Sequence, residues 1–285
     1  MKYRLIAIDL DGTLLCPEGK VSEENRAALH AAHERGVVVL PCTGRAWRES
    51  CRVLDSVPDA ELGVFNTGGM VHELRSGSTV HRTAFDAETA NGLIELLRPM
   101  PEAVLVFTDP AETGLEYVIT GDGQPTNNSL WWFEHNGLRF ARHAEPPCEL
   151  MDHVVRVSAV VARSRAIQIE RDVAAHFGDT VEVHSFGAVQ RSDEGEELFI
   201  TEVFPKGVTK WLGIRYVAER FGIGLDEVAV IGDQINDLPM FAEAACAVAM
   251  GNAIEPIKQV AHRHTHRNDE HGVAHAIRQM LNGVW

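Results

Sequence analysis

The feature that most constrains the fold is an alternation of strand-like and helix-like stretches over about the first 70 residues. An apolar run at 4–8 precedes a helical stretch at 22–36, in which Ser22 is a candidate N-cap and Gly36 a candidate C-terminal glycine. A β-branched run, a second helical stretch and another apolar run follow at 37–42, 45–57 and 62–66. Strands that alternate with helices pair in parallel through right-handed crossovers. The pattern predicts an α/β fold with a doubly wound, Rossmann-like parallel sheet.

The same alternation of helix-like and strand-like stretches returns near the C-terminus, but the middle of the chain has a different pattern. A helical stretch at 206–223 is followed by strand-like runs at 227–233 and 246–250, with helix-like residues 235–245 between them. The middle segment has two long helical stretches, near 86–99 and 163–177, and strand-like runs at 103–108, 116–120, 154–161 and 181–186. We therefore expect a core made of residues 1–84 and 198–285, with an α+β domain, 85–197, inserted into it.

Composition narrows the class of partner. The chain has 285 residues, 26 basic against 41 acidic, and a net charge of −15. This balance disfavours nucleic acid and anionic membranes and favours a small or metal-bound partner. Five cysteines without a CxxC pair indicate reduced thiols, and acids interrupt the apolar N-terminus too early for a signal peptide. With no apolar run of membrane-spanning length, we expect a cytoplasmic protein, and the sequence leaves its oligomeric state open.

Polar residues gather where the predicted strands end, which is where doubly wound sheets bind ligands. They are Asp9 and Asp11 after the first strand, Thr43, Gly44 and Arg45 after the second, Asp233, Asn236 and Asp237 after a late strand, and Lys206 and Lys210 at the start of the preceding helix. We expect acids, a hydroxyl, backbone amides and a lysine to converge on one rim.

This inventory suits phosphate and a hard divalent cation. Side chains two apart on a strand point the same way, so we expect the carboxylates of Asp9 and Asp11 to share a partly desolvated space. Mg²⁺ takes oxygen ligands and would offset the repulsion between these acids and Asp233. A carboxylate can attack phosphorus, and a second acid can protonate the leaving oxygen and then activate water.

Four motifs occur in order: "DLDGTLL" at 9–15, "TGR" at 43–45, a lysine in "PKGVTK" at 205–210, and "GDQINDLPM" at 232–240. In this order and spacing the chain resembles the haloacid dehalogenase superfamily. The longer context around the last two motifs, and the tail "NDEHGVAHAI", resemble the Cof-type phosphatases, which carry a type IIB (C2) cap. The resemblance covers about 1–84 and 198–285, and the size and position of the insertion.

The resemblance implies roles for the first two motifs. Asp9 would be the nucleophile and a Mg²⁺ ligand. Asp11 would be the general acid and base, and its backbone carbonyl would also bind the metal. Thr43 would bind the transferring phosphoryl group, with Gly44 and Arg45 beside it as substrate-binding residues.

The resemblance also implies roles for the later motifs. Lys210 would be the catalytic lysine, because the phrase "EVFPKGVTK" matches a family phrase in which an earlier Lys-Gly pair, here Lys206-Gly207, precedes it. Asp233 would be the acidic metal ligand, Asp237 its supporting partner, and Asn236 a phosphate or substrate contact.

The chain departs from the family pattern at two places. Trp211 follows the lysine where glycine is usual, and the third strand leads into "FNTGG" rather than Asn-Gly-Ala, so that Asn66 or Thr67 fills the asparagine's place. Both departures concern substrate contacts more than phosphoryl chemistry.

The resemblance favours a Mg²⁺-dependent phosphatase that hydrolyses a small phosphate monoester, a sugar phosphate or related metabolite, through an aspartyl-phosphate intermediate. Two rivals stay open: a phosphomutase of the same superfamily, and a non-catalytic phosphoacceptor or ligand sensor. A sensor needs no acid two residues after the nucleophile, so Asp11 favours turnover.

Other features have simpler interpretations. Taken singly, the strand-end acids, the threonine and the lysines are typical of turns, helix entries and solvated helix ends. The "HRHTHR" tract at 262–267 fits a polar loop better than a metal site. Trp131 and Trp132 fit packing within the insertion as well as a substrate pocket. His184, Arg191 and Asp193 lie late in the insertion, where substrate contact is one alternative.

Overall fold

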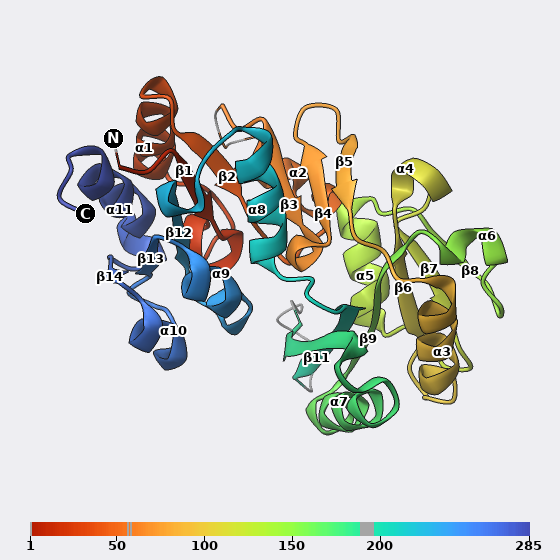
Figure 1. The fold of residues 1–285 in the computed structure, drawn as a ribbon. Coiled ribbons are helices and arrows are strands. Elements are labelled where there is room, and N and C mark those ends of the chain that lie inside the picture. The colour runs from red at the N-terminus through yellow and green to blue at the C-terminus, as the bar shows by residue number, and fades with distance from the viewer. Residues whose placement is uncertain (1, 56, 58, 189–196) are drawn as a thin grey trace. The chain divides into compact units, whose positions relative to one another are not determined.

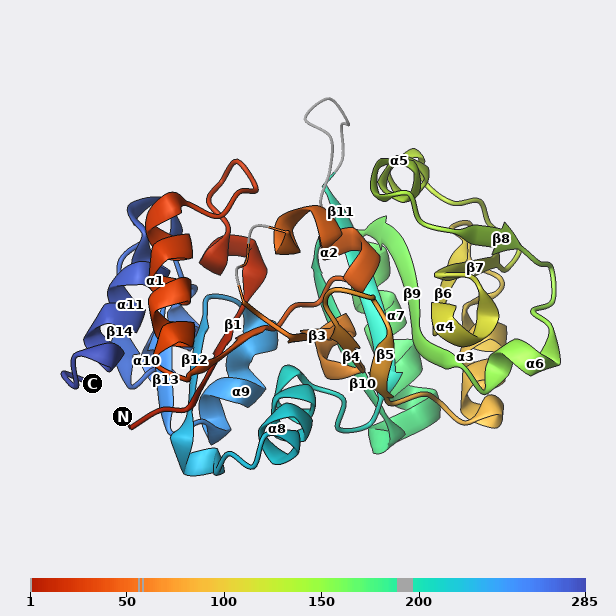
Figure 2. The ribbon, with the colours of Figure 1, turned by 90° about the horizontal axis from the view of Figure 1, so that it is seen from above.

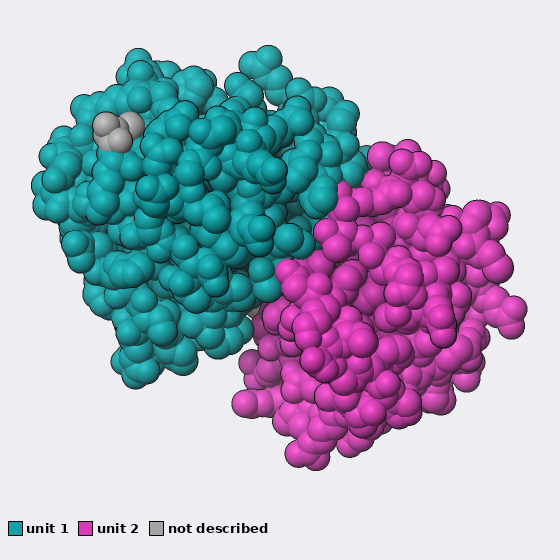
Figure 3. Space-filling view, viewed as in Figure 1, with its two compact units in different colours: residues 1–81, 209–285 teal, residues 82–208 magenta. Residues whose placement is uncertain are grey.

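The computed structural model describes residues 2–55, 57, 59–188 and 197–285. The chain forms two compact units, Met1–His81 with Thr209–Trp285, and Arg82–Val208 (Figure 3). The sequence interpretation divided the chain at 84/85 and 197/198, whereas the second unit also holds residues 82–84 and the longer segment 198–208. The physical reason is that strand β11 (Leu198–Pro205) forms an antiparallel ladder with β9 (Val154–Ala162), which belongs to the second unit.

The first unit is built on a parallel sheet. Its strands are ordered β14-β13-β12-β1-β2, and neighbouring strands run parallel. The strands are β1 (Leu5–Ile8), β2 (Val38–Pro41), β12 (Val228–Gly232), β13 (Cys246–Ala249) and β14 (Arg263–His264). The residues of β1, β12 and β13 are buried throughout, as expected of parallel strands covered on both faces. The predicted doubly wound core is confirmed.

Helices cover this sheet on two sides. In Figures 1 and 2, α1 (Glu23–Glu34) and α11 (Gly272–Leu281) lie side by side on one side of β1 and β12. On the other side are α8 (Lys210–Arg220) and α9 (Leu238–Glu243). The Ser22 hydroxyl caps α1 by accepting from the Asn25 backbone N–H at 3.2 Å, as predicted. Shorter helices are α2 (Trp47–Leu54) and α10 (Glu255–Val260).

Beyond β2 the chain forms a small second sheet that the sequence interpretation did not contain. Strand β3 (Leu62–Phe65) has a parallel bridge to the end of β2 between Cys42 and Val64, and it pairs antiparallel with β4 (Met70–Glu73). β5 (Thr79–Arg82) lies next to β4.

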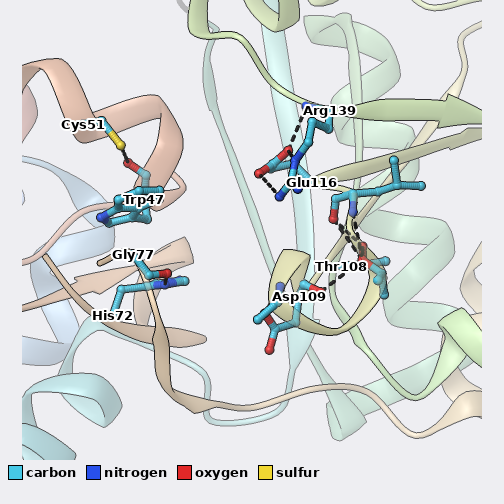
Figure 4. A network of polar contacts seen from close by, with 11 residues as sticks. Trp47, Cys51, His72, Gly77, Thr108, Asp109, Glu116 and Arg139 are labelled. Atoms are coloured by element: carbon cyan, nitrogen blue, oxygen red, sulfur yellow. Dashed lines mark hydrogen bonds and ion pairs between the residues drawn. The ribbon is translucent and has the colours of Figure 1, made fainter. Parts of the chain in front are cut away.

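The turn between β4 and β5 packs under α2. The Gly77 backbone has φ +72°, and a Cβ there would lie 2.4 Å from the Trp47 ring. The Gly77 carbonyl is 3.0 Å from Nδ1 of His72, whose ring stacks on that of Trp47 (Figure 4). A glycine is therefore required at this turn.

The second unit is a sheet ordered β10-β11-β9-β6-β7-β8. The remaining strands are β6 (Val104–Thr108), β7 (Tyr117–Thr120), β8 (Phe140–Arg142) and β10 (Val181–Gly187). Apolar residues of α3 (Ala87–Leu97) and α7 (Arg163–Phe177) pack against the sheet in one hydrophobic core. These are the two long helices predicted from the sequence. Helices α4 (Pro110–Thr113), α5 (Asn127–Asn136) and α6 (Cys148–Met151) were not predicted.

Buried charges in the second unit are paired. The Glu116 carboxylate is nearly inaccessible and accepts from the backbone N–H of Arg139 at 2.7 Å and from its guanidinium at 3.0 Å (Figure 4). Arg156, which is 2% exposed, donates to the Glu202 carboxylate and to the Tyr117 hydroxyl. Pairing of this kind offsets the cost of removing charge from water. Within the described residues, no helix has the length and apolar character needed to cross a membrane.

Candidate active site

The carboxyl ends of β1, β2 and β12 lie level with one another. Ile8 at the end of β1 is in register with Pro41 of β2 and Ile231 of β12. The residues that follow, Asp9, Cys42 and Gly232, therefore begin the same edge of the sheet. The expected convergence of polar residues on this edge follows from the register.

Asp9 and Asp11 do not share one desolvated space, which corrects the expectation from strand alternation. β1 ends at Ile8, and residues Leu10–Leu14 form a tight turn with Gly12 at φ +78°. Asp9 is 4% exposed, whereas the Asp11 side chain is 51% exposed and lies at the rim. The alternation of a strand cannot extend into a turn, and that is why the expectation was wrong.

Lys210 is the cation of the buried site. It is fully buried, and its Nζ donates to Oδ1 of Asp9 at 2.5 Å and to Oδ1 of Asp237 at 2.6 Å. Burial by itself lowers the pKa of Lys210, but the Asp237 and Asp9 carboxylates raise it by more than that. The pKa is therefore above its usual value, and the ammonium stays charged. The other lysine of the motif, Lys206, pairs with Asp179 of the second unit at 3.0 Å. Its side chain is 55% exposed.

Asp237 supports this arrangement with both oxygens. Oδ1 accepts from Lys210, and Oδ2 accepts from the backbone N–H of Asp233 at 2.8 Å and of Gln234 at 3.0 Å. A Cβ at position 232 would lie 2.4 Å from Oδ2, so Gly232 permits the close approach. These contacts fit the supporting role that the resemblance implied.

Asp233 is held by a residue that the sequence interpretation missed. The buried Thr13 hydroxyl donates to Oδ1 of Asp233 at 2.7 Å. Gly12 packs against the same carboxylate, because a Cβ there would lie 2.4 Å from Oδ2. The turn also receives a hydrogen bond from Nδ2 of Asn252 to the Gly12 carbonyl at 2.7 Å. A threonine two residues after the second acid was the available signal for Thr13.

Burial raises the pKa of the Asp9 carboxyl well above its usual range, against the lowering effect of the Lys210 ammonium. The carboxylates of Asp237 and Asp233 add to the rise. Burial also raises the pKa of Asp233 to about 6, although the Thr13 hydrogen bond lowers it. Both shifts report an excess of negative charge in a space with little water.

The carboxylates of Asp9, Asp233 and Asp237 are spaced to hold a cation. Each offers one oxygen, and the three oxygens lie within 4.8 Å of one another. In the described part of the chain, neither Oδ2 of Asp9 nor Oδ2 of Asp233 has a hydrogen-bond partner, whereas both oxygens of Asp237 do. Oxygen ligands are those that Mg²⁺ prefers, so the donor set fits the predicted ion. Among the described residues no other such group occurs, the 262–267 tract included.

The loop after β2 holds Thr43, Gly44 and Arg45. Thr43 is 1% exposed, and its Oγ1 accepts from the Arg45 backbone N–H at 3.2 Å. Gly44 lies beside Asn236, since a Cβ at 44 would be 3.7 Å from Nδ2 of Asn236. The Arg45 guanidinium donates two hydrogen bonds to the Asp11 carboxylate, one of them from Nε to Oδ2 at 2.7 Å. The structure thus joins Arg45 to Asp11.

A strained turn after β3 forms a further side of this region. Asn66, Thr67 and Gly68 have φ of +48°, +55° and +102°. A Cβ at Gly68 would lie 1.8 Å from the Thr209 carbonyl oxygen, immediately before Lys210. Gly68 has to be glycine at this contact, and Asn66 and Thr67 stay the two candidates for the place of the asparagine in the family's Asn-Gly-Ala. The other departure, Trp211, is a buried residue of α8 at 6% exposure.

The structure describes three of the five residues of the insertion that were considered for substrate contact. His184 is half-buried, and its Nε2 has no hydrogen-bond partner among the described residues. Trp131 and Trp132 lie on α5 with ring centroids 6.0 Å apart, and Trp131 stacks on His135. Arg191 and Asp193 lie outside the described residues. Substrate contact by any of them stays a prediction.

Comparison with known proteins places this geometry in a family. A model of the haloacid dehalogenase-like hydrolases matches residues 6–277. The 5-amino-6-(5-phospho-D-ribitylamino)uracil phosphatase YwtE of Bacillus subtilis (strain 168) is 28% identical over 291 residues, which cover 99% of each protein. A solved haloacid dehalogenase-like hydrolase from Bacteroides thetaiotaomicron is 26% identical with a TM-score of 0.77, covering 98% of this chain and 100% of that one.

A second solved structure, the haloacid dehalogenase subclass IIB sugar phosphatase BT4131, is 21% identical with a TM-score of 0.76. It covers 98% of this chain and 99% of that one, and it shows a shared fold. The predicted superfamily, with its inserted domain, and the predicted enzyme class, a phosphoric monoester hydrolase, are confirmed at the level of the family. The chain belongs to the haloacid dehalogenase-like hydrolases.

Proposed function

We propose that the protein is a Mg²⁺-dependent phosphatase that hydrolyses a small phosphate monoester through an aspartyl-phosphate intermediate. The observation that carries the proposal is the buried Lys210 ammonium, held 2.5 Å from Oδ1 of Asp9 at the end of β1. A buried lysine paired with a strand-end carboxylate provides a nucleophile and a fixed positive charge at one place. Catalysis of phosphoryl transfer depends on such positioning and charge stabilisation.

Asp9 is the nucleophile in this proposal. One of its carboxylate oxygens forms a bond to phosphorus while the bond from phosphorus to the alcohol oxygen breaks. Lys210 stabilises the charge that develops on the phosphoryl oxygens, and Thr43 donates its hydroxyl hydrogen to one of them. Asn236 and the loop at Gly44 help to position the same group.

Asp11 is the general acid and base. Its carboxyl gives a proton to the departing alcohol oxygen, then takes one from the water that attacks phosphorus as the bond to Asp9 breaks. Inorganic phosphate and the free Asp9 carboxylate result. The exposed position of Asp11 supports this role, because a leaving group and water can both reach it. The ion pair with Arg45 has to shift before either proton transfer.

Asp9 and Asp233 would hold the Mg²⁺ ion through the carboxylate oxygens that have no other partner, with the Asp11 backbone carbonyl as a third protein ligand. When bound, the ion supplies positive charge that offsets the carboxylates and the phosphate. Asp237 and Thr13 keep the ligands in place, because they hydrogen-bond to Asp233.

We propose a sugar phosphate or a related phosphorylated metabolite as the substrate. The relative YwtE, as its name states, acts on a phosphorylated ribityl compound. The proposed cap is the second unit, residues 82–208, which is inserted between β5 and α8 of the first. Caps close over a site, exclude bulk water and contribute specificity.

The test is release of inorganic phosphate from a generic aryl phosphate, followed by a panel of phosphorylated sugars and sugar alcohols. Repeated turnover in the presence of Mg²⁺ supports a phosphatase. Labelling that stops at one phosphate per chain would instead indicate a phosphoacceptor sensor, and transfer within a sugar phosphate without phosphate release would indicate a mutase.

A further inference from the structure

The turn Asn66–Gly68 stores backbone strain next to the proposed phosphoryl site. Thr67 is a β-branched residue at φ +55°, a left-handed conformation that such residues rarely adopt. Asn66 precedes it at φ +48°. Strain of this kind costs about 1–3 kcal/mol per residue and persists where the surroundings impose it.

The surroundings that impose it are the start of α8 and the loop after β2. Gly68 packs against the Thr209 carbonyl, because a Cβ at position 68 would lie only 1.8 Å from that oxygen. The backbone N–H of Thr67 donates to the Thr43 carbonyl at 3.2 Å, and that of Asn66 to the Arg45 carbonyl at 2.9 Å. The turn is thus tied on one side to the residue before Lys210 and on the other to Thr43.

The Thr67 hydroxyl lacks a hydrogen-bond partner in the described part of the chain. Thr67 is 2% exposed, and its Oγ1 makes no hydrogen bond with any of the described residues. The carboxamide of Asn66, at 0% exposure, is likewise without one. An unsatisfied buried polar group costs about 1–3 kcal/mol, so its presence calls for a ligand or a functional reason.

The hydroxyl lies next to the loop that would hold the phosphoryl group. A Cβ placed on Gly44 would lie 3.5 Å from Oγ1 of Thr67 and 3.7 Å from Nδ2 of Asn236. Thr67 and Asn236 therefore flank Gly44 at comparable distances, one from each neighbouring turn.

We propose that Thr67 is a phosphate-binding residue whose hydroxyl donates a hydrogen bond to an oxygen of the phosphoryl group. The inference rests on the proposed function and extends it to a side chain in the segment that departs from the family's Asn-Gly-Ala. Because Oγ1 is closed off from solvent, its donation requires a rotation of the Thr67 side chain about χ1 toward the group. Without phosphate the hydroxyl has no partner among the residues that the structure describes, and with phosphate it gains one.

This difference between the free and bound protein defines the experiment. Thr67→Val removes the hydroxyl and keeps the shape, and Thr67→Ser keeps the hydroxyl. The matched control is Thr265→Val, because Thr265 is also buried in the first unit but its hydroxyl donates to the Gly272 carbonyl at 2.6 Å. Affinity for inorganic phosphate in Mg²⁺ is measured by calorimetry, and stability by thermal unfolding without phosphate.

We expect Thr67→Val to unfold at the wild-type temperature or above it, and to bind phosphate on the order of ten-fold more weakly. Thr67→Ser should retain most of the affinity. Thr265→Val should unfold at a lower temperature and bind phosphate as the wild type does.

Wild-type phosphate affinity in Thr67→Val would overturn the proposal, as would a loss of stability equal to that of Thr265→Val with no loss of affinity. Failure of the proposed function is a separate outcome, because the wild type itself would then release no phosphate from an aryl ester.

Discussion

Lys210→Met is the perturbation that tests the centre of the site most directly. Methionine is similar in length and apolar, so it fills the buried space but leaves Asp9 and Asp237 without their shared cation. Lys210 is fully buried, and its Nζ contacts the two carboxylates at 2.5 and 2.6 Å. Its removal therefore affects both catalysis and folding.

The expected size follows from the geometry. At an effective dielectric constant of about 20, each contact corresponds to roughly 6 kcal/mol of attraction. The desolvation that the three groups undergo on folding offsets much of this, and the loss of one partner of a buried ion pair costs about 3–5 kcal/mol. Turnover should also fall by a factor on the order of a hundred or more, because a fixed charge at the phosphoryl group is lost.

The assay separates these two effects. Unfolding in urea gives the change in free energy, and phosphate release from an aryl phosphate gives turnover at concentrations where the variant is folded. The double variant Asp9→Asn with Lys210→Met removes one of the stranded charges, so it should recover part of the stability lost in Lys210→Met without any recovery of activity. Lys206→Met is the control, because Lys206 is exposed and pairs with Asp179 at 3.0 Å.

The reasoning would be refuted if Lys206→Met abolished turnover and a folded Lys210→Met retained it. It would also fail if the stabilities of Lys210→Met and of the double variant were equal, because Asp9 would then not depend on Lys210 in the folded protein.

Three further predictions concern the same edge of the sheet. Asp9→Asn should reduce turnover to background with the fold intact, as measured by phosphate release and circular dichroism, and a folded variant with substantial activity would contradict the nucleophile assignment. Chelation should abolish turnover, and Mg²⁺ should restore it better than Ca²⁺ because Ca²⁺ accepts longer and more numerous ligands. Mg²⁺ should also raise the unfolding temperature. Full activity in metal-free protein argues against this site. Gly68→Ala should destabilise the protein by more than Gly207→Ala, since Gly207 also has a positive φ, +77°, but open space around it. Equal urea midpoints would remove Gly68 from its positioning role.

Much of the fold was predictable because the signals are local. The apolar runs of β1 and β12 identify buried parallel strands, and their ends place Asp9 and Asp233 on one edge. The two long helices of the second unit have apolar positions at helical spacing. The resemblance then selected Lys210 over Lys206, and the contacts of the two lysines favour that choice.

The remaining features depend on contacts between distant residues. Sequence alternation placed Asp11 beside Asp9, but a turn with Gly12 at φ +78° moves it to the rim. From the sequence, β11 was assigned to the start of the second core segment. In the structure it pairs with β9 and therefore belongs to the second unit. The helix α5 contains consecutive aromatic residues and lacks a clear apolar stripe. The Thr13 hydroxyl donates to Asp233, which lies 220 residues away, so no local pattern could reveal this hydrogen bond.

A count of charge connects the separate observations about the site. Asp9, Asp233 and Asp237 would carry three negative charges against the one positive charge of Lys210. Burial is the main cause of the raised pKa values of Asp9 and Asp233, and the neighbouring carboxylates add to the rise. A bound divalent cation would balance the remaining two charges, so that a phosphate dianion would enter a site close to neutral. As long as Arg45 is paired with Asp11, its charge is already balanced.

The phosphate oxygens must therefore be satisfied largely by neutral donors in addition to Lys210 and the ion. Backbone N–H groups and hydroxyls are the donors that the loops at the strand ends offer, Thr43 among them. A threonine held at φ +55° with an unpaired hydroxyl beside Gly44 is the kind of donor this charge balance requires. Strain and an unsatisfied group weaken the free protein, and both become understandable if the hydroxyl is reserved for the phosphoryl oxygens.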